Sequence, residues 1–175
     1  HGKTMEIVKR AISLGFDSVM IDGSTLSYKE NVKLTKRVVE YAHKRNVSVE
    51  GELGLLDVVD DDSTVGGNAQ FTDPKQAKEF VYLTGVDSLA VSIGTNHGVN
   101  KYIGEPKIRY DILKKIEKEL PNFPIVLHGA SLVEQKYVDS INNHGGHIKK
   151  SVGNENLLKN AYKTNICKIN MDTDF

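Results

Sequence analysis

This chain of 175 residues has a single cysteine, no long apolar run and no excess of either charge. Cys167 is the one cysteine, so no internal disulfide can form, and we expect a reducing compartment, the cytoplasm. No run of about 18 apolar residues is present, so we expect no membrane-spanning helix. No signal peptide is visible at the start of the sequence.

The charges of the two signs cancel. Lys and Arg together number 23, as do Asp and Glu, so the formal net charge is zero. A protein that holds nucleic acid by bulk charge needs a basic excess that displaces counterions, and this chain lacks one. Hydrophobic residues make up 39% of the chain, which is enough to bury a real core. We therefore expect a globular domain without a nucleic-acid partner.

Short β-branched runs alternate with stretches of helical periodicity along the chain. The run at 89–93 is apolar throughout, which is typical of a strand in a buried parallel sheet. Asp73 followed by Pro74 indicates the start of a helix, and Gly15 indicates the end of another. We predict strands at 18–21, 47–50, 89–93, 124–127 and 166–169, and helices at 4–14, 28–45, 74–84, 110–120, 134–143 and around 157–162.

Alternating strands and helices imply an α/β fold with a parallel sheet and right-handed crossovers, either a doubly wound sheet or a barrel. A closed (β/α)8 barrel needs eight strands and typically about 250 residues. The chain opens without a strand before its first helix and stops just after a strand, and no linker or repeat divides it. We therefore expect residues 1–175 to form a single partial domain, with about strands 4–8 of a (β/α)8, or TIM, barrel.

Two of the predicted strands run into a His-Gly pair. The strand at 89–93 leads to His97-Gly98, the strand at 124–127 leads to His128-Gly129, and His1-Gly2 opens the chain. Active sites of α/β barrels lie at the carboxyl ends of the strands. Three imidazoles with an open position suit a catalytic zinc ion. A His-Gly pair after a strand is also an ordinary turn, so this hypothesis depends on the three histidines meeting.

Carboxylates and small polar residues follow the other predicted strands. Asp22 and Glu52 are suited to orient the imidazoles or to bind a second, harder cation. Free amides and hydroxyls after the last three strands suit a phosphate group, which barrels often bind near their last two strands. Beside a metal site, they indicate a phosphorylated substrate with a carbonyl group. This second set comprises Gly98, Lys101, Gly129, Ala130, Ser131, Asn170, Met171, Asp172 and Thr173.

Six short motifs follow one another along the chain in the order and at the spacing of a known enzyme family. They are HG at 1–2, SVMIDGS at 18–24, VSVEGELG at 47–54, IGTNHG at 93–98, VLHGAS at 126–131 and KINMDTD at 168–174. Together they resemble the class II, zinc-dependent fructose-bisphosphate aldolases over essentially the whole chain. The resemblance implies a TIM barrel that reversibly cleaves fructose 1,6-bisphosphate to dihydroxyacetone phosphate and glyceraldehyde 3-phosphate, in glycolysis and gluconeogenesis.

The resemblance also implies a role for each motif. A catalytic Zn²⁺ would polarise the substrate ketone, and no lysine Schiff base is needed. The second set above would hold dihydroxyacetone phosphate. The implied metal ligands are His1, His97 and His128 for zinc, and Asp22 and Glu52 for a second divalent or monovalent cation.

The chain departs from the family's pattern after Gly54. The family usually carries Thr-Leu-Gly-Gly-Ile-Glu there, whereas this chain has Leu-Leu-Asp-Val-Val-Asp at 55–60. Asp60 falls where a mobile-loop Glu assists proton transfer, so Asp60 is the candidate catalytic residue within the chain. The family's main catalytic Asp immediately precedes the histidine that matches His1 and lies outside the chain. We therefore expect the chain alone to be inactive.

Two alternatives remain open from the sequence. Tagatose-bisphosphate aldolases usually end the last strand in Val-Ala-Thr-Glu, and the Met-Asp-Thr-Asp at 171–174 favours fructose bisphosphate. The altered loop at 55–60 motivates the other alternative, a diverged, non-catalytic protein that binds zinc or a phosphosugar. The expected partner is a phosphorylated sugar substrate, and the full-length protein is expected to be a homodimer or larger.

Overall fold

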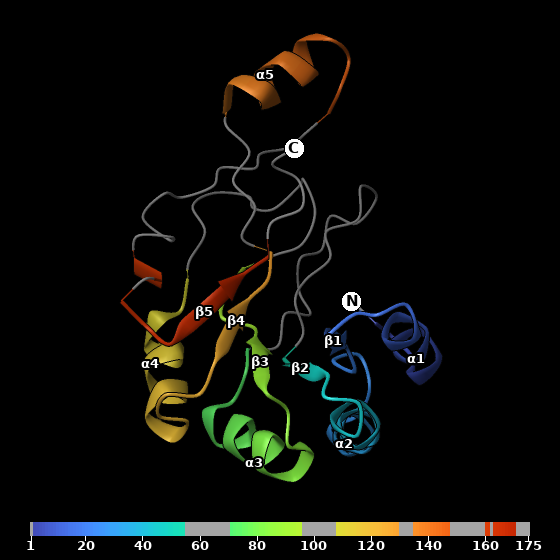
Figure 1. Ribbon diagram of the computed structural model, residues 1–175. Helices are drawn as coiled ribbons and strands as arrows, with labels where there is room; N and C mark the ends of the chain where they lie inside the picture. The colour runs from blue at the N-terminus through green and yellow to red at the C-terminus, as the bar shows by residue number, and fades with distance from the viewer. Residues whose placement is uncertain are drawn as a thin grey trace.

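Five parallel strands form one sheet in the computed structural model of the chain (Figure 1). The structure describes residues 2–54, 71–95, 108–129, 135–147, 160–161 and 163–170. Each strand pairs with the next one in chain order. The strands are β1 (Ser18–Ile21), β2 (Ser48–Leu53), β3 (Ser88–Val91), β4 (Ile125–Leu127) and β5 (Ile166–Ile169).

The helices begin and end at residues whose capping chemistry the sequence supplies. The side chain of Asp73 accepts a hydrogen bond from a first-turn N–H of α3 at 2.9 Å, Pro74 opens that helix, and Gly85 closes it with a φ of 73°. Ser27 and Glu30 form a capping box at the start of α2. The helices are α1 (Met5–Ser13), α2 (Tyr28–His43), α3 (Pro74–Thr84), α4 (Tyr110–Glu119) and α5 (Gln135–Asn143).

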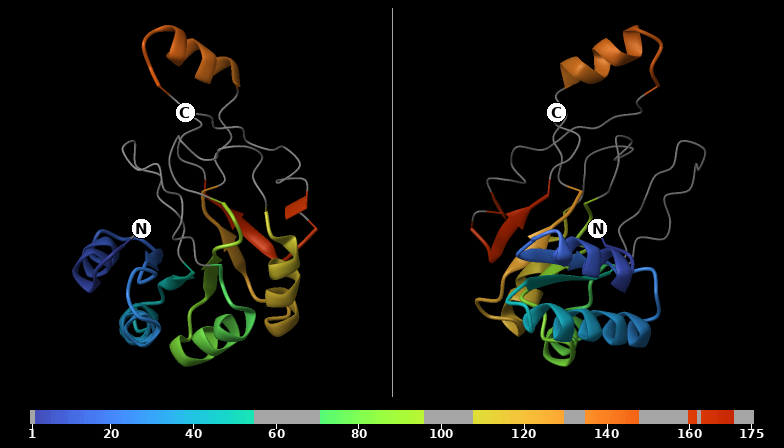
Figure 2. Two further views of the ribbon diagram at one scale, coloured as in Figure 1. Left: turned by 180° about the vertical axis from the view of Figure 1, so that it is seen from behind. Right: turned by 45° about the vertical axis from the view of Figure 1, so that its right-hand side comes forward.

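The strand order decides between the two architectures that the alternation left open. A doubly wound sheet reverses its strand order at a switch point, whereas every neighbour here is the next strand along the chain. Helices α1 to α4 follow one another around the outside of the sheet, each packed on the one before (Figures 1 and 2). Consecutive βα units of a (β/α)8 barrel are arranged in this way. The expectation of an incomplete α/β barrel is therefore confirmed.

The outer face of the sheet is apolar and packs against these helices. Leu89 of β3 and Ile125 of β4 pair in register on this face, and Phe80 of α3 and Ile116 of α4 belong to the same buried cluster. All four side chains are fully buried. Burial of one such side chain contributes roughly 1.5–3 kcal/mol to folding. This layer fixes the position of each strand and hence of the residues that follow it.

The inner face of the sheet is different. Partners in register share a face, so Glu52, Ala90, Val126 and Lys168 lie in one row across four strands. Neither Ala90 nor Val126 belongs to the apolar cluster of the outer face. The inner face therefore combines small or apolar side chains with charged ones.

Most of the predicted elements are confirmed within two residues. The main difference is β2, which continues to Leu53 beyond the predicted end at residue 50, because its last three residues pair with β3. The predicted loop at 55–71 and the predicted helix around 157–162 lie almost wholly outside the described residues. Helix α5 lies apart from the sheet in Figure 1. None of the described helices has the length and hydrophobicity that crossing a membrane requires.

Candidate metal and substrate site

Predicted site residues meet at the carboxyl edge of the sheet. Asp22 follows β1, Glu52 lies near the end of β2, and His128 directly follows β4. His128 is fully buried, and Glu52 is only 4% exposed. The structure brings these two together, because Nδ1 of His128 lies 3.5 Å from Oε2 of Glu52. His128 and Glu52 are thus two predicted metal ligands that the structure places next to each other.

A second carboxylate holds the other side of the imidazole ring. Nε2 of His128 lies 2.7 Å from Oε1 of Glu50, and both side chains are buried. The sequence reasoning did not select Glu50. The signal that identifies it is spacing, because Glu50 and Glu52 are two residues apart on one strand and so share a face. His128 therefore lies between two glutamates of the same strand.

Lys168 of β5 contacts the same carboxylate from a third strand. Its Nζ lies 2.5 Å from Oε2 of Glu50. Half of the Lys168 side chain is exposed, whereas Glu50 is buried. The Glu50 carboxylate thus bridges a buried imidazole and a partly hydrated ammonium group. The contact joins β2, β4 and β5 across the inner face.

The paired charges shift the pKa values of this cluster. Burial by itself lowers the pKa of His128, but hydrogen bonds and charges from Glu50 and Glu52 outweigh burial and raise that pKa to about 9. Burial raises the pKa of Glu50, yet the hydrogen bonds from His128 and Lys168 bring it below its usual value. At Glu52 burial prevails, and the nearby charge of Asp22 adds to it, so the pKa is raised. Glu50 is therefore the more strongly ionised of the two glutamates.

Asp22 is held in a turn at the end of β1. Its Oδ1 accepts hydrogen bonds from the backbone N–H of Ser24 at 3.0 Å and from the Ser24 hydroxyl at 2.7 Å. A Cβ at Gly23 would lie 2.4 Å from Oδ1 of Asn31, so only glycine permits this close approach to α2. Asn31 donates from Nδ2 to the backbone oxygen of Glu52 at 2.9 Å. These bonds fix the ends of β1 and β2 relative to one another.

His1 and His97, the other two predicted zinc ligands, lie outside the described residues. The nearest described residues, Gly2 and Thr95, lie at the carboxyl ends of β1 and β3. Gly2 forms a parallel bridge with the end of β1, and its carbonyl oxygen accepts a hydrogen bond from the N–H of Asp22 at 2.8 Å. Thr95 is buried just beyond β3, two residues before His97. Convergence of the three histidines stays a prediction that these neighbours favour.

Gly129 and Asn170 are the described members of the predicted phosphate-binding set. Gly129 has a φ of 63°, a left-handed conformation that favours glycine. The N–H of Asn170 donates to the backbone oxygen of Leu127 at 2.9 Å, which places Asn170 at the same edge as His128. Outside the described residues lie Asp60, Gly98, Lys101, Ala130, Ser131, Met171, Asp172 and Thr173.

Within the described ranges, no three His, Cys, Asp or Glu side chains are grouped so that they could hold a metal ion by themselves. The chemistry of the donors nevertheless suits one. A metal-binding histidine usually has its second ring nitrogen on a carboxylate, as His128 has on Glu50. Glu52, opposite Nδ1, adds an oxygen donor that suits a harder cation. The residues present fit a metal ion that takes further ligands from outside the described ranges.

Three further described histidines lie on the surface. His43, His144 and His147 are exposed. Nε2 of His43 lies 2.9 Å from Oδ2 of Asp87. That carboxylate also accepts a hydrogen bond from the backbone N–H of Val49 at 2.7 Å. The His43 pair therefore joins α2 to the outside of the sheet and serves packing.

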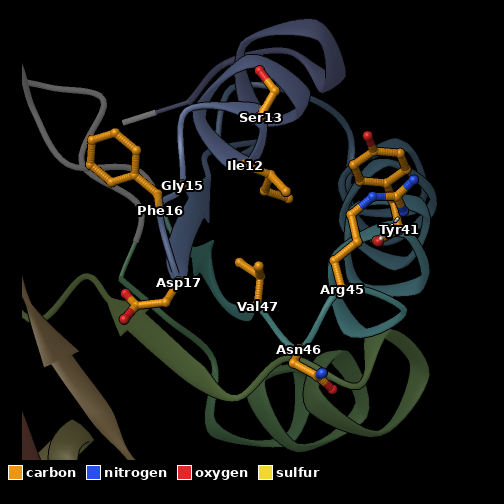
Figure 3. Close-up of a pocket in the computed structure, with 9 residues that line it drawn as sticks. All are labelled: Ile12, Ser13, Gly15, Phe16, Asp17, Tyr41, Arg45, Asn46 and Val47. Carbon is orange, nitrogen blue, oxygen red and sulfur yellow. Dashed lines mark hydrogen bonds between the residues drawn. The ribbon is translucent and has the colours of Figure 1, made fainter.

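A cavity of about 420 Å³ lies at the opposite end of the sheet (Figure 3). It opens between the ends of α1 and α2, beside the amino ends of β1 and β2. The Arg45 guanidinium lies 3.7 Å from the Tyr41 ring centroid and donates to the Tyr41 carbonyl, so its charge faces its own helix. No predicted site residue lines the cavity, so it is not the candidate active site. Its lining comprises Ile12, Ser13, Gly15, Phe16, Asp17, Tyr41, Arg45, Asn46 and Val47.

Comparison with known proteins identifies the family. The family model described as fructose-bisphosphate aldolase class-II matches residues 1–175. The chain belongs to the class II fructose-bisphosphate aldolase family. The edge that carries His128, Glu52 and Asp22 is therefore part of a class II aldolase domain, as the six sequence motifs predicted.

Two relatives are 48% identical to this chain. They are the fructose-bisphosphate aldolases of Treponema pallidum and Giardia intestinalis. The matches cover 99% of this chain, and 57% and 54% of those proteins respectively. The chain thus spans about half the length of the curated relatives that it matches.

Two solved structures are similar to this chain in fold. The crystal structure of the YdjI aldolase from Escherichia coli K12 is 34% identical, with a TM-score of 0.68, and the match covers 97% of this chain and 50% of that one. A crystal structure from Coccidioides immitis is 29% identical, with a TM-score of 0.74, and the match covers 98% and 54%. Both likenesses support the assignment of the five strands to part of a barrel.

Proposed function

We propose that this chain is part of a metal-dependent aldolase that reversibly cleaves fructose 1,6-bisphosphate to dihydroxyacetone phosphate and glyceraldehyde 3-phosphate. The family match over residues 1–175 supports the class of reaction. The observation that carries the proposal at the site is the buried His128, held by Glu50 on one ring nitrogen and facing Glu52 with the other. A histidine in a simple turn needs no buried carboxylate on its ring, whereas a metal-binding histidine typically has one on the nitrogen that does not bind the metal, as His128 has in Glu50.

The chain's own residues hold and shield the proposed metal ion. Such an ion supplies a Lewis acid that polarises the carbonyl of the substrate. His128 offers Nδ1, because Glu50 occupies Nε2, and the burial of this ring keeps water away from its side of the site. The proposed ligands are His1, His97 and His128 for catalytic Zn²⁺, and Asp22 and Glu52 for a second divalent or monovalent cation.

The proposed substrate contacts follow the last three strands. Gly129 has no side chain, so a phosphate group can approach its backbone closely. Asp60 is the proposed proton-transferring residue within the chain. The proposed contacts with dihydroxyacetone phosphate are Gly98, Lys101, Gly129, Ala130, Ser131, Asn170, Met171, Asp172 and Thr173.

A combined zinc and turnover assay on the intact protein tests the proposal. We expect one catalytic zinc ion per active site, and cleavage of fructose 1,6-bisphosphate that a chelator abolishes and added zinc restores. Cleavage that survives complete removal of metal contradicts the proposal. Bound zinc without turnover supports instead the non-catalytic alternative that the altered loop at 55–60 motivates.

The same assay separates the two bisphosphate substrates. We expect fructose 1,6-bisphosphate to be preferred over tagatose 1,6-bisphosphate, because the last strand is followed by Met-Asp-Thr-Asp at 171–174. The names of the two relatives at 48% identity support the same choice. A higher kcat/KM for tagatose 1,6-bisphosphate would reverse this assignment.

Assembly and location complete the proposal. We infer a homodimer or larger assembly in the cytoplasm, where the exposed thiol of Cys167 stays reduced. Light scattering on the intact protein measures the assembly.

A further inference from the structure

The contact between Glu50 and His128 has a consequence for the orientation of the ring. Glu50 is buried on β2, and its Oε1 lies 2.7 Å from Nε2 of His128. An ionised carboxylate only accepts hydrogen bonds, so Nε2 must carry the proton that it donates. In the neutral ring the lone pair is then on Nδ1, which is the nitrogen that a metal ion needs.

The direction in which Nδ1 faces follows from the strand. Glu52 is two residues further along β2 than Glu50, which is about 6.6 Å closer to the carboxyl edge. Nδ1 of His128 lies 3.5 Å from Oε2 of Glu52, so it faces that edge, while Nε2 faces the interior. Glu50 thus contacts the His128 ring at Nε2, on the side away from the proposed metal site.

Lys168 of β5 holds the Glu50 carboxylate in this position. Its Nζ lies 2.5 Å from Oε2 of Glu50, the carboxylate oxygen that does not contact the ring. A buried carboxylate is costly unless it is paired, and here each of its oxygens has a partner of suitable charge. The ammonium group therefore fixes the rotation of the Glu50 carboxylate, so that its other oxygen stays aligned with Nε2 of His128.

We propose that Glu50, held by Lys168, is a positioning residue that fixes the tautomer and orientation of His128, so that Nδ1 is presented to the metal ion. The inference rests on the proposed metal-dependent function. Glu50 touches neither the substrate nor the metal and acts only through the imidazole. Outer partners of this kind typically change metal affinity by about 10–100-fold.

Zinc affinity of the intact protein tests this proposal directly. Competition against a chromogenic chelator gives the zinc Kd of the wild type and of Glu50→Gln, which keeps the shape and removes the charge. We expect the Kd to rise about 10–100-fold in Glu50→Gln and less in Lys168→Met, because the carboxylate remains in the latter. Cobalt substitution adds a spectroscopic readout, and the visible bands of Co²⁺ should change in Glu50→Gln.

A matched control separates positioning from stability. Glu119→Gln removes a charge from an exposed pair with Lys78 and should leave both the Kd and the Co²⁺ spectrum unchanged. Chemical denaturation of all variants shows how much each substitution changes the free energy of unfolding. A Glu50→Gln protein with a Kd within about twofold of the wild type and the same Co²⁺ bands overturns the proposal.

The wild type provides a test that does not depend on any variant folding. In the zinc-loaded protein, ¹⁵N-labelled histidine should show His128 protonated on Nε2, and a proton on Nδ1 instead overturns the proposal. Wild-type protein that binds no zinc overturns the proposed function and this inference together. Zinc binding with an Nδ1 proton, or with an unchanged Kd in Glu50→Gln, removes this inference alone.

Discussion

The two faces of the sheet are held by different forces. On the outer face, Leu89 and Ile125 are buried against helices by apolar contact. On the inner face, Glu50 and His128 are buried just as deeply, and a hydrogen bond and paired charges hold them. Gly51 faces α3 between two glutamates that face inward, so adjacent residues of one strand belong to different layers.

This difference separates stability from chemistry. Apolar side chains of the outer face contribute in proportion to buried area and shape, so their loss should lower the free energy of unfolding. Groups of the inner face gain little net stability from their pairing, because burial of charge costs nearly what the pairing returns. We therefore expect outer substitutions to act mainly on unfolding and inner substitutions mainly on metal binding and turnover.

The largest effect is expected on the outer face. Phe80→Ala should lower the free energy of unfolding by about 3–5 kcal/mol, because it leaves a cavity between α3 and the sheet. Denaturant unfolding of the intact protein measures this change. Tyr82→Ala is the control on the same helix, since Tyr82 is 87% exposed, and it should change stability by less than about 0.5 kcal/mol. Equal losses in both variants would contradict the assignment of the outer layer.

The inner face should respond through activity. His128→Gln should lower turnover by more than about 100-fold, or about 2.7 kcal/mol, because a lost ligand costs more than a lost outer partner. Steady-state kinetics and zinc content measure the loss. His43→Gln removes an exposed imidazole paired with Asp87 and should keep full zinc content and turnover. Normal activity in His128→Gln would place the chemistry away from this edge.

The outer layer could be predicted from the sequence because its signals are local. The apolar run at 89–93 and the cap formed by Asp73 and Pro74 each depend on a few neighbouring residues. Local sequence signals could not distinguish a barrel from a doubly wound sheet. Local periodicity is the same in both, and the strand order decides between them.

The inner face could be predicted only in part. Histidines at strand ends indicated the edge, and the motifs indicated Glu52 and Asp22, but Glu50 and Lys168 were missed. Their contact joins residues 118 positions apart, and no local pattern records such a pairing. The end of β2 was missed for a related reason, because pairing with β3 carries Gly51 to Leu53 into the strand despite a glycine.

Gly51 provides a sharper test of the two layers. An added Cβ would lie 3.0 Å from a Phe80 ring carbon and 3.0 Å from a Val86 methyl, so Gly51→Ala overpacks the outer layer. We expect a loss of about 1–3 kcal/mol in unfolding free energy and an unchanged zinc Kd. Ser48→Ala, at an exposed position of the same strand, is the control. A zinc Kd that rises with Gly51→Ala would show that the layers are coupled through β2.

The smallest effect is expected at the start of α3, next to the carboxyl ends of β2 and β3. Asp73→Ala removes the cap and should cost about 1 kcal/mol in unfolding free energy, whereas Asp73→Asn should retain most of it. The adjacent Thr72 donates to the backbone oxygen of Leu53 and accepts from the N–H of Ser92, so it joins the ends of β2 and β3. If that junction is rigid, Asp73→Ala will lower the free energy of unfolding and leave the zinc Kd unchanged. A matching rise in the zinc Kd would mean that the cap also holds Glu52 in place.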